Sequence, residues 1–247
     1  MARISRPVPP WVSLLRAIWL AILVGLGVEI LCLAFQTGLI KLPPTATILA
    51  DTLQRVSWSV LVCAGLAAGL ALPRGPAIAG SGRAMSVIGI LSAPVAFAAA
   101  RALHQAVLHA ANGEPGAAAG PLVFAVAGIR ALEYGVFGYV LARLVRLPPP
   151  KWRGYVGLGA AVGATFGAVT LITMNAMSAT AVGVAVNIVR GVNELAFPIG
   201  CALVLYATTR TTTWATTLRA APPSFEEART EVYTNKSGRS ARPGATA

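Results

Sequence analysis

Hydrophobic residues along this chain gather in six long runs that are separated by short polar connections. A helix crosses the hydrocarbon core of a membrane with about 20 apolar residues, and each run has roughly that length. Because a backbone in lipid must satisfy its own hydrogen bonds, every run is predicted to be an α-helix. The runs cover residues 11–35, 53–72, 85–108, 121–144, 155–177 and 181–207. The pattern therefore predicts an all-α integral membrane protein, built as a bundle of six transmembrane helices.

The connections between the runs are short and rich in turn residues, so no separate soluble domain fits between the helices. The first run is too long for the apolar part of a signal peptide and lacks a clear cleavage site, so we interpret it as a retained span. The chain then divides into a cytoplasmic N-terminal segment, 1–10, a transmembrane domain, 11–214, and a C-terminal tail, 215–247. The tail is polar and contains proline, which predicts disorder.

Composition agrees with a membrane protein and narrows the choice of partners. Hydrophobic residues make up 56% of the chain and charged residues 11%, whereas a soluble domain carries about 25% charged residues. The net charge of +12 would suit nucleic acid, but no basic helix is interleaved with aromatic residues. We therefore expect contact with the lipid bilayer and no nucleic acid. A second copy of the chain or other membrane subunits are further candidate partners.

Lysine and arginine divide the connections into two sets. They are frequent before the first run, in the second and fourth connections, and at the start of the tail, whereas the fifth connection has none. Connections rich in lysine and arginine stay in the cytoplasm. The pattern predicts both termini in the cytoplasm, with the protein in a plasma (inner) membrane of the bacterial type.

Two runs carry an arginine and a glutamate at positions otherwise fit for lipid. These are Arg130 and Glu133 in the fourth run, and Arg190 and Glu194 in the sixth. Spacings of three and four place each pair on one helix face, so pairing along the helix is one interpretation. The acid preferably precedes the base in such pairs, and here the order is reversed. Partners on neighbouring helices are therefore expected.

Three more charges lie at a comparable predicted depth: Glu29, Arg55 and Arg101. A charge at the centre of a bilayer costs roughly 2.5 to 3.5 kcal/mol on insertion scales, so these groups must face one another or water. The charges are predicted to form a layer in the outer half of the bundle. The recurrence of an early arginine in the second, fourth and sixth runs suggests that the helices form three related hairpins.

The first functional hypothesis is a small transporter or channel-like subunit with this layer as its polar site. Arg130 and Arg190 would recognise the charge of a small anionic or cationic solute, and the glutamates that follow them would respond to a proton or a cation. Glu29 and Arg101 would form an outer gate. The candidate binding residues are Arg130, Glu133, Arg190, Glu194, Glu29, Arg101 and Asn193.

The second hypothesis is a non-catalytic membrane subunit or scaffold in which the same charges only lock the helices together. An intramembrane enzyme is a third and less favoured hypothesis, because the chain has no zinc-binding, nucleophile-elbow or nucleotide-binding motif. His104 and His109 lie about 140° apart around a helix and cannot share one metal. They are interpreted as interfacial residues, and no particular cofactor or metal is indicated.

Small residues suggest how the helices pack. Gly159, Gly163 and Gly167 recur at a spacing of four in the fifth run, which favours close packing of helices within the molecule. Gly65 and Gly69 repeat the pattern in the second run. The three cysteines fall on different runs at different predicted depths, so each is interpreted as a small apolar filler.

Overall fold

Six long helices account for most of the chain. The computed structural model describes residues 10–39, 43–71, 82–113, 120–146, 151–178 and 182–217. The helices are α1 (Pro10–Leu39), α2 (Thr45–Ala71), α3 (Gly82–Asn112), α4 (Pro121–Leu144), α5 (Trp152–Ala176) and α6 (Val184–Thr217). Each is long and apolar enough to cross a membrane, and the described ranges contain no strand. The prediction of an all-α, multi-pass membrane protein with six helices is confirmed at this level.

Several helices are longer than their apolar runs. α2 begins at Thr45 rather than at 53, and α6 continues to Thr217 rather than ending at 207. The reason is that hydropathy marks only the part of a helix that suits lipid, whereas helical hydrogen bonding continues through polar residues beyond it. The extra turns of α2 bring Asp51 into the helix.

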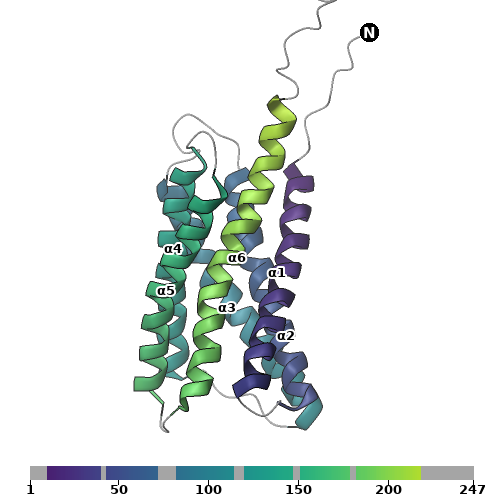
Figure 1. Ribbon diagram of the computed structural model, residues 1–247, viewed down its shortest axis with the longest axis vertical. Coiled ribbons are helices and arrows are strands. Elements are labelled where there is room, and N and C mark those ends of the chain that lie inside the picture. Colours follow the sequence, from purple (N-terminus) through teal and green to yellow (C-terminus); the bar gives the residue numbers. More distant parts are fainter. Residues whose placement is uncertain are drawn as a thin grey trace, which may run out of the picture.

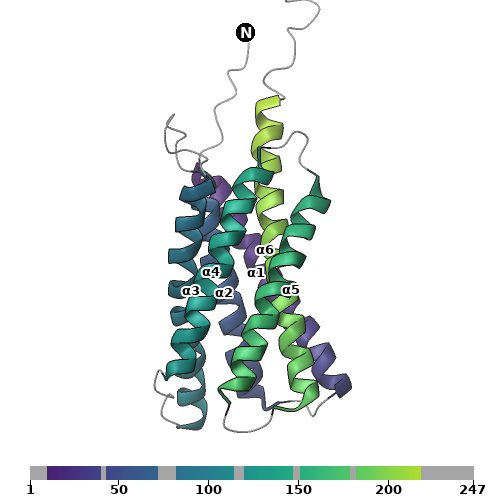
Figure 2. The same ribbon diagram turned by 90° about the vertical axis from the view of Figure 1, so that its left-hand side faces the viewer.

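The six helices form a closed ring in the order of the sequence. Each helix packs against its neighbours in the chain, α6 returns to pack against α1, and α2 and α6 also touch across the ring. Successive helices run in opposite directions, as Figure 1 and the turned view in Figure 2 show. α2 packs against α3 about as extensively as α5 packs against α6, and more extensively than α1 packs against α2. The first two predicted hairpins are therefore not set apart from each other in the ring, whereas α5 packs less extensively against α4 than against α6.

The bundle has two distinct ends. α1 begins and α6 ends at the same end of the bundle (Figure 1), which we call the terminal end; α4 ends and α5 begins there too. α1, α3 and α5 end, and α2, α4 and α6 begin, at the other end of the bundle, which we call the opposite end. The cytoplasmic location of the terminal end stays a prediction. Residues 1–9 and 218–247, including most of the predicted tail, lie outside the described residues.

The glycines at four-residue spacing pack helices together within the molecule, as predicted. A Cβ atom added at Gly163 would lie 2.9 Å from the backbone oxygen of Glu194, and one at Gly167 would lie 2.8 Å from the Glu194 Cβ. Pro198 lies inside α6 and has no N–H, so the Glu194 carbonyl four residues earlier lacks its helical donor. The two glycines of α5 therefore fit directly against this part of α6.

The cysteine depths were predicted wrongly. Cys63 of α2 and Cys201 of α6 are both buried, and their sulfur atoms lie 3.3 Å apart. Depths counted along separate runs could not show this contact, because each helix extends beyond its run by a different amount. The contact fixes how far α2 and α6 are shifted along each other. It lies closer to the terminal end than the charged residues of these two helices do.

Candidate functional site

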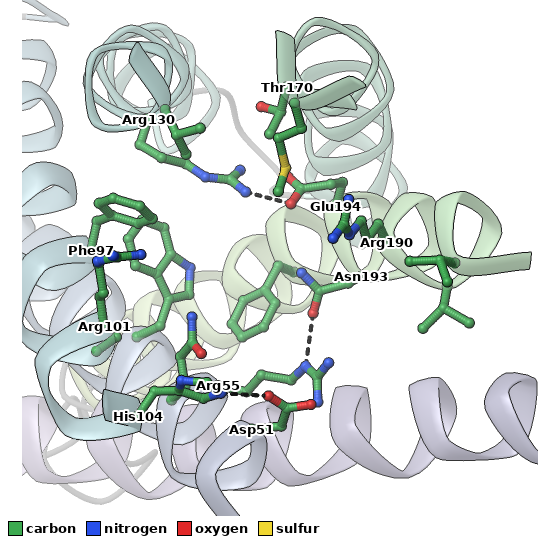
Figure 3. Close-up of a pocket in the computed structure, with 18 of the residues that line it drawn as sticks. Asp51, Arg55, Phe97, Arg101, His104, Arg130, Thr170, Arg190, Asn193 and Glu194 are labelled. Carbon is green, nitrogen blue, oxygen red and sulfur yellow. Dashed lines mark hydrogen bonds and ion pairs between the residues drawn. The ribbon is translucent and has the colours of Figure 1, made fainter. Parts of the chain in front are cut away.

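A cavity of about 820 Å³, with charged side chains in a largely apolar wall, lies inside the ring and receives side chains from all six helices. Part of its lining comes from residues near the opposite end, including Gln36 at the end of α1, Pro43 before α2 and Leu108 near the end of α3. The cavity therefore extends from the middle of the bundle towards the opposite end. Its charged lining, part of which is drawn in Figure 3, consists of Asp51, Arg55, Arg101, Arg130, Arg190 and Glu194, with His104 beside them.

Arg130 of α4 binds two glutamates at once. Its Nη1 donates to Glu133 Oε2 at 2.6 Å, and its Nη2 donates to Glu194 Oε1 of α6 at 2.5 Å. Glu133 is fully buried and Glu194 is 7% exposed. The guanidinium also lies over the ring of Trp58, 5.6 Å from its centroid. The expected partnership across helices is thus present between α4 and α6, together with the local pair on α4.

The second oxygen of each of these carboxylates has no partner among the described residues. Glu133 Oε1 and Glu194 Oε2 are both buried and make no hydrogen bond. One guanidinium therefore serves two carboxylates, and two acceptor atoms remain for a proton, a cation, water or a donor from a bound molecule.

Arg55 of α2 connects α1 to α6. It forms an ion pair with Glu29 of α1, and its Nε donates to Asn193 Oδ1 of α6 at 3.1 Å. The Glu29 side chain is 5% exposed and the Arg55 side chain 16%. Glu29 thus has its partner on the neighbouring helix α2, while Asn193 is held with its amide at the cavity wall (Figure 3).

Arg190 differs from the other arginines of α2, α4 and α6. It is partly buried and lines the cavity, yet it makes no hydrogen bond or ion pair with any other residue that the structure describes. Glu194, one turn further along α6, is bound by Arg130 instead. The reversed order of the arginine and the glutamate on α6 therefore coincides with the absence of a pair along the helix.

The α3 side of the cavity carries Arg101 and His104. His104 Nε2 lies 3.1 Å from Asp51 Oδ1 of α2. His104 belongs to the cavity wall, and its location at the membrane interface stays a prediction. Sequence reasoning missed Asp51, because the second apolar run was taken to begin at 53. The spacing of Asp51, Arg55 and Trp58 at intervals of four and three would have placed all three on one helix face.

The wall also contains aromatic rings and an unused hydroxyl. Trp58, Phe97 and Phe197 line the cavity, and the Trp58 and Phe97 rings meet edge to face with centroids 6.4 Å apart. Thr170 of α5 is 1% exposed, and its hydroxyl has no partner among the described residues. The site thus combines guanidinium groups, carboxylates, a free hydroxyl and an apolar wall.

No three His, Cys, Asp or Glu side chains in the described ranges come together in a way that could hold a metal ion. The chemistry that this geometry offers is the recognition of charge by guanidinium groups and the exchange of protons or cations at carboxylates. Comparison of the chain with protein families, curated proteins and solved structures finds no match.

Proposed function

We propose that this protein is a small membrane transporter whose cavity binds a small anionic solute that enters from the opposite end of the bundle. The observation that carries the proposal is Arg190, a guanidinium that lines the cavity inside the bundle and has no partner in the described structure. A charged group inside a membrane bundle faces water, a counter-ion or a substrate. A guanidinium can hold a carboxylate or a phosphate through two parallel hydrogen bonds.

Neighbouring groups support an organic or inorganic anion at this place. Arg190 and Glu194 are one turn apart on α6, and the unpaired Thr170 hydroxyl faces the same cavity from α5 (Figure 3). In the proposal Arg190 is the primary contact for the solute, and Arg130 is the inner contact. Arg101 would act as a gate together with Glu29, which is linked to the cavity through Arg55.

The glutamates would balance the charge of the solute. Glu133 and Glu194 share Arg130, so this group of three carries one negative charge more than positive when both acids are ionised. A proton or a cation taken up at Glu194 would offset that charge as the anion binds. This coupling would let an anion enter a low-dielectric bundle without leaving an uncompensated charge.

A non-catalytic subunit held together by an ionic lock is the second candidate. The observation in its favour is that the three glutamates are buried, at 4% exposure for Glu29, 0% for Glu133 and 7% for Glu194, and that each is paired with an arginine. In that case the paired groups would only hold the helices, and Arg190 would be surrounded by water. The two candidates therefore differ in what Arg190 does.

The test measures anion binding to the purified chain in detergent. Acetate, benzoate, succinate, phosphate and sulfate would each be titrated while the midpoint of thermal unfolding is recorded. A ligand at 100 times its dissociation constant stabilises the folded state by about 2.7 kcal/mol. We expect at least one of these anions to raise the midpoint of the parent, and Arg190→Gln to abolish that rise.

The matched control is Arg16→Gln, which removes an exposed arginine of α1 outside the cavity. This variant should respond to the anion as the parent does. A parent that responds to none of the five anions, or an Arg190→Gln variant that responds as the parent does, would favour the subunit interpretation.

A further inference from the structure

We propose that the outer groove between α4 and α5 is a binding site for an anionic membrane phospholipid. The groove has a volume of about 450 Å³ and lies towards the terminal end of the bundle, away from the charged cavity. Its lining is almost entirely apolar: Val136, Val140 and Leu144 come from α4, and Gly154, Leu158, Ala161, Val162, Thr165 and Phe166 come from α5. The inference does not depend on the proposed transport function.

The groove faces outwards, and its length suits an acyl chain. Val136 is 45% exposed, and Ala161 and Thr165 are exposed on α5, so this surface meets the hydrocarbon of the membrane. From Gly154 to Phe166 the helix rises by twelve residue steps, about 18 Å. One leaflet of the hydrocarbon core is about 15 Å thick, half of the whole. The groove therefore covers the depth that a single acyl chain occupies.

Cations gather where the groove reaches the terminal end. Leu144 and Gly154, which line the groove, are next in sequence to Arg143 and Arg153, and the connection between them holds Arg146 and Lys151. Arg143 is bound to the Tyr139 hydroxyl, and the Arg153 guanidinium lies 5.8 Å from the centroid of the Trp152 ring. Arg146 and Lys151 are exposed, and neither side chain makes a hydrogen bond or ion pair with the described part of the chain.

Charge complementarity identifies the occupant. The structure describes four acidic residues: Glu29, Glu133 and Glu194 form ion pairs with arginines, and Asp51 is hydrogen-bonded to His104. None of them neutralises Arg146 or Lys151. Basic residues above a groove between transmembrane helices suit a lipid phosphate, and Trp152, 52% exposed beside them, is the residue type that lies at the level of lipid headgroups. A zwitterionic lipid would fill the groove equally well but would gain less from these cations.

The test compares two lipids on the full chain. The purified and delipidated protein would be titrated in detergent with dioleoyl phosphatidylglycerol or with dioleoyl phosphatidylcholine, and bound lipid would be counted by native mass spectrometry. We expect one tight site for phosphatidylglycerol. Each basic residue near a membrane surface contributes about a factor of five to the binding of anionic lipid. The double variant Arg146→Gln/Lys151→Gln should therefore bind phosphatidylglycerol roughly 30-fold more weakly.

Two matched controls keep the test specific. The double variant Arg16→Gln/Arg83→Gln removes two exposed arginines at the same end of the bundle, one from α1 and one from α3. Its affinity for phosphatidylglycerol should change less than about 2-fold, because neither arginine adjoins the groove. Ala161→Phe fills the groove and should also weaken binding, whereas Ala164→Phe alters an exposed residue of α5 outside the groove lining and should not.

Three results would overturn the proposal: equal affinity for both lipids, equal losses in the two double variants, or unchanged binding after Ala161→Phe. The first two would indicate a general lipid layer or a general charge effect. The third would place the lipid elsewhere on the bundle. Folding of each variant would be checked by its thermal unfolding midpoint, so that a loss of binding is read only in a folded protein.

Discussion

Arg130 holds two carboxylates that have no other described cationic partner, so its removal would leave both Glu133 and Glu194 buried and unpaired. Breaking a buried ion pair by removing one partner costs roughly 3 to 5 kcal/mol. We expect Arg130→Leu to lower the free energy of unfolding by at least that amount, because two acids lose their partner. Thermal or denaturant unfolding of the purified protein in detergent measures the change.

A double variant separates the loss of the Arg130–Glu194 ion pair from other effects of the leucine substitution at position 130. Adding Glu194→Gln to Arg130→Leu should recover part of the lost stability, because it removes one of the two stranded charges. Arg190→Leu is the control at the cavity, and we expect it to change stability by less than about 1 kcal/mol, since this arginine has no described partner to strand. A large loss in Arg190→Leu would mean that Arg190 belongs to the buried ion-pair network.

For single residues, the sequence predicted most of the charged side chains of the site but few of the pairs that they form. Arg130, Glu133, Arg190 and Glu194 stand out because charges are rare in apolar runs. Which of them meet depends on how far each helix is rotated and shifted against its neighbour, and neither quantity is encoded in hydropathy. The spacing of residues along the chain therefore could not predict that Glu194 pairs with Arg130 rather than with Arg190.

Among the helices, α3 and α4 approach each other most closely at two glycines, Gly89 and Gly138. A Cβ atom at Gly89 would collide with the backbone carbonyl of Tyr134, and one at Gly138 would collide with the carbonyl of Met85. We expect Gly89→Ala and Gly138→Ala each to destabilise the protein by about 1 to 3 kcal/mol, the usual cost of overpacking. Unfolding in detergent measures this cost.

Gly157 on α5 is the matched control for these substitutions. No neighbouring atom lies within 4 Å of the Cβ position there, so Gly157→Ala should be neutral or should stabilise the helix by up to about 1 kcal/mol. If alanine is tolerated equally at all three positions, α3 and α4 are further apart than the structure places them.

The contact between α2 and α6 can be tested through its cysteines. The sulfur atoms of Cys63 and Cys201 lie 3.3 Å apart, and a disulfide requires about 2.05 Å, so a small movement would join them. We expect copper phenanthroline to remove two of the three free thiols of the native protein, with one mole of disulfide formed within a single chain. Cys201→Ala should keep both remaining thiols, and Cys32→Ala should lose both. Retention of all three thiols in the parent would contradict this packing.

The sequence predicted helix packing only where small residues recur. The glycines of α5 and α2 repeat every four residues and were recognised as packing faces, and the structure places the α5 set against α6. Gly89 and Gly138 stand without such a repeat, so no local pattern distinguishes them from glycines that touch nothing. The order of helices around the ring also depends on contacts between distant residues, which a single sequence does not display.

On the scale of the whole molecule, the described acidic and basic residues are distributed unevenly along the bundle. The described acids lie in or beside the cavity, whereas exposed arginines and lysine without a described acidic partner, such as Arg146 and Lys151, lie at the terminal end. The first arrangement supports a solute site, and the second supports both the predicted cytoplasmic location of that end and the proposed lipid site. The proposed function and the predicted orientation can therefore be tested together, by finding from which side of the membrane water reaches the cavity.

Labelling of single cysteines in vesicles answers that question. In a variant without its three native cysteines, Asn193→Cys places a thiol on the cavity wall, and Lys151→Cys places one at the terminal end. A membrane-impermeant maleimide should label Asn193→Cys in vesicles whose outer face corresponds to the cell exterior, and Lys151→Cys only in inverted vesicles. Because the cavity lining contains more arginines than carboxylates, a sulfonated thiosulfonate reagent should react with Asn193→Cys faster than its trimethylammonium counterpart. Labelling of both positions from the same side would show that the cavity opens to the terminal end. Protection of Asn193→Cys from both sides would show that the charged residues are not reached by water. In that case the arginines and glutamates lock the helices and carry no solute.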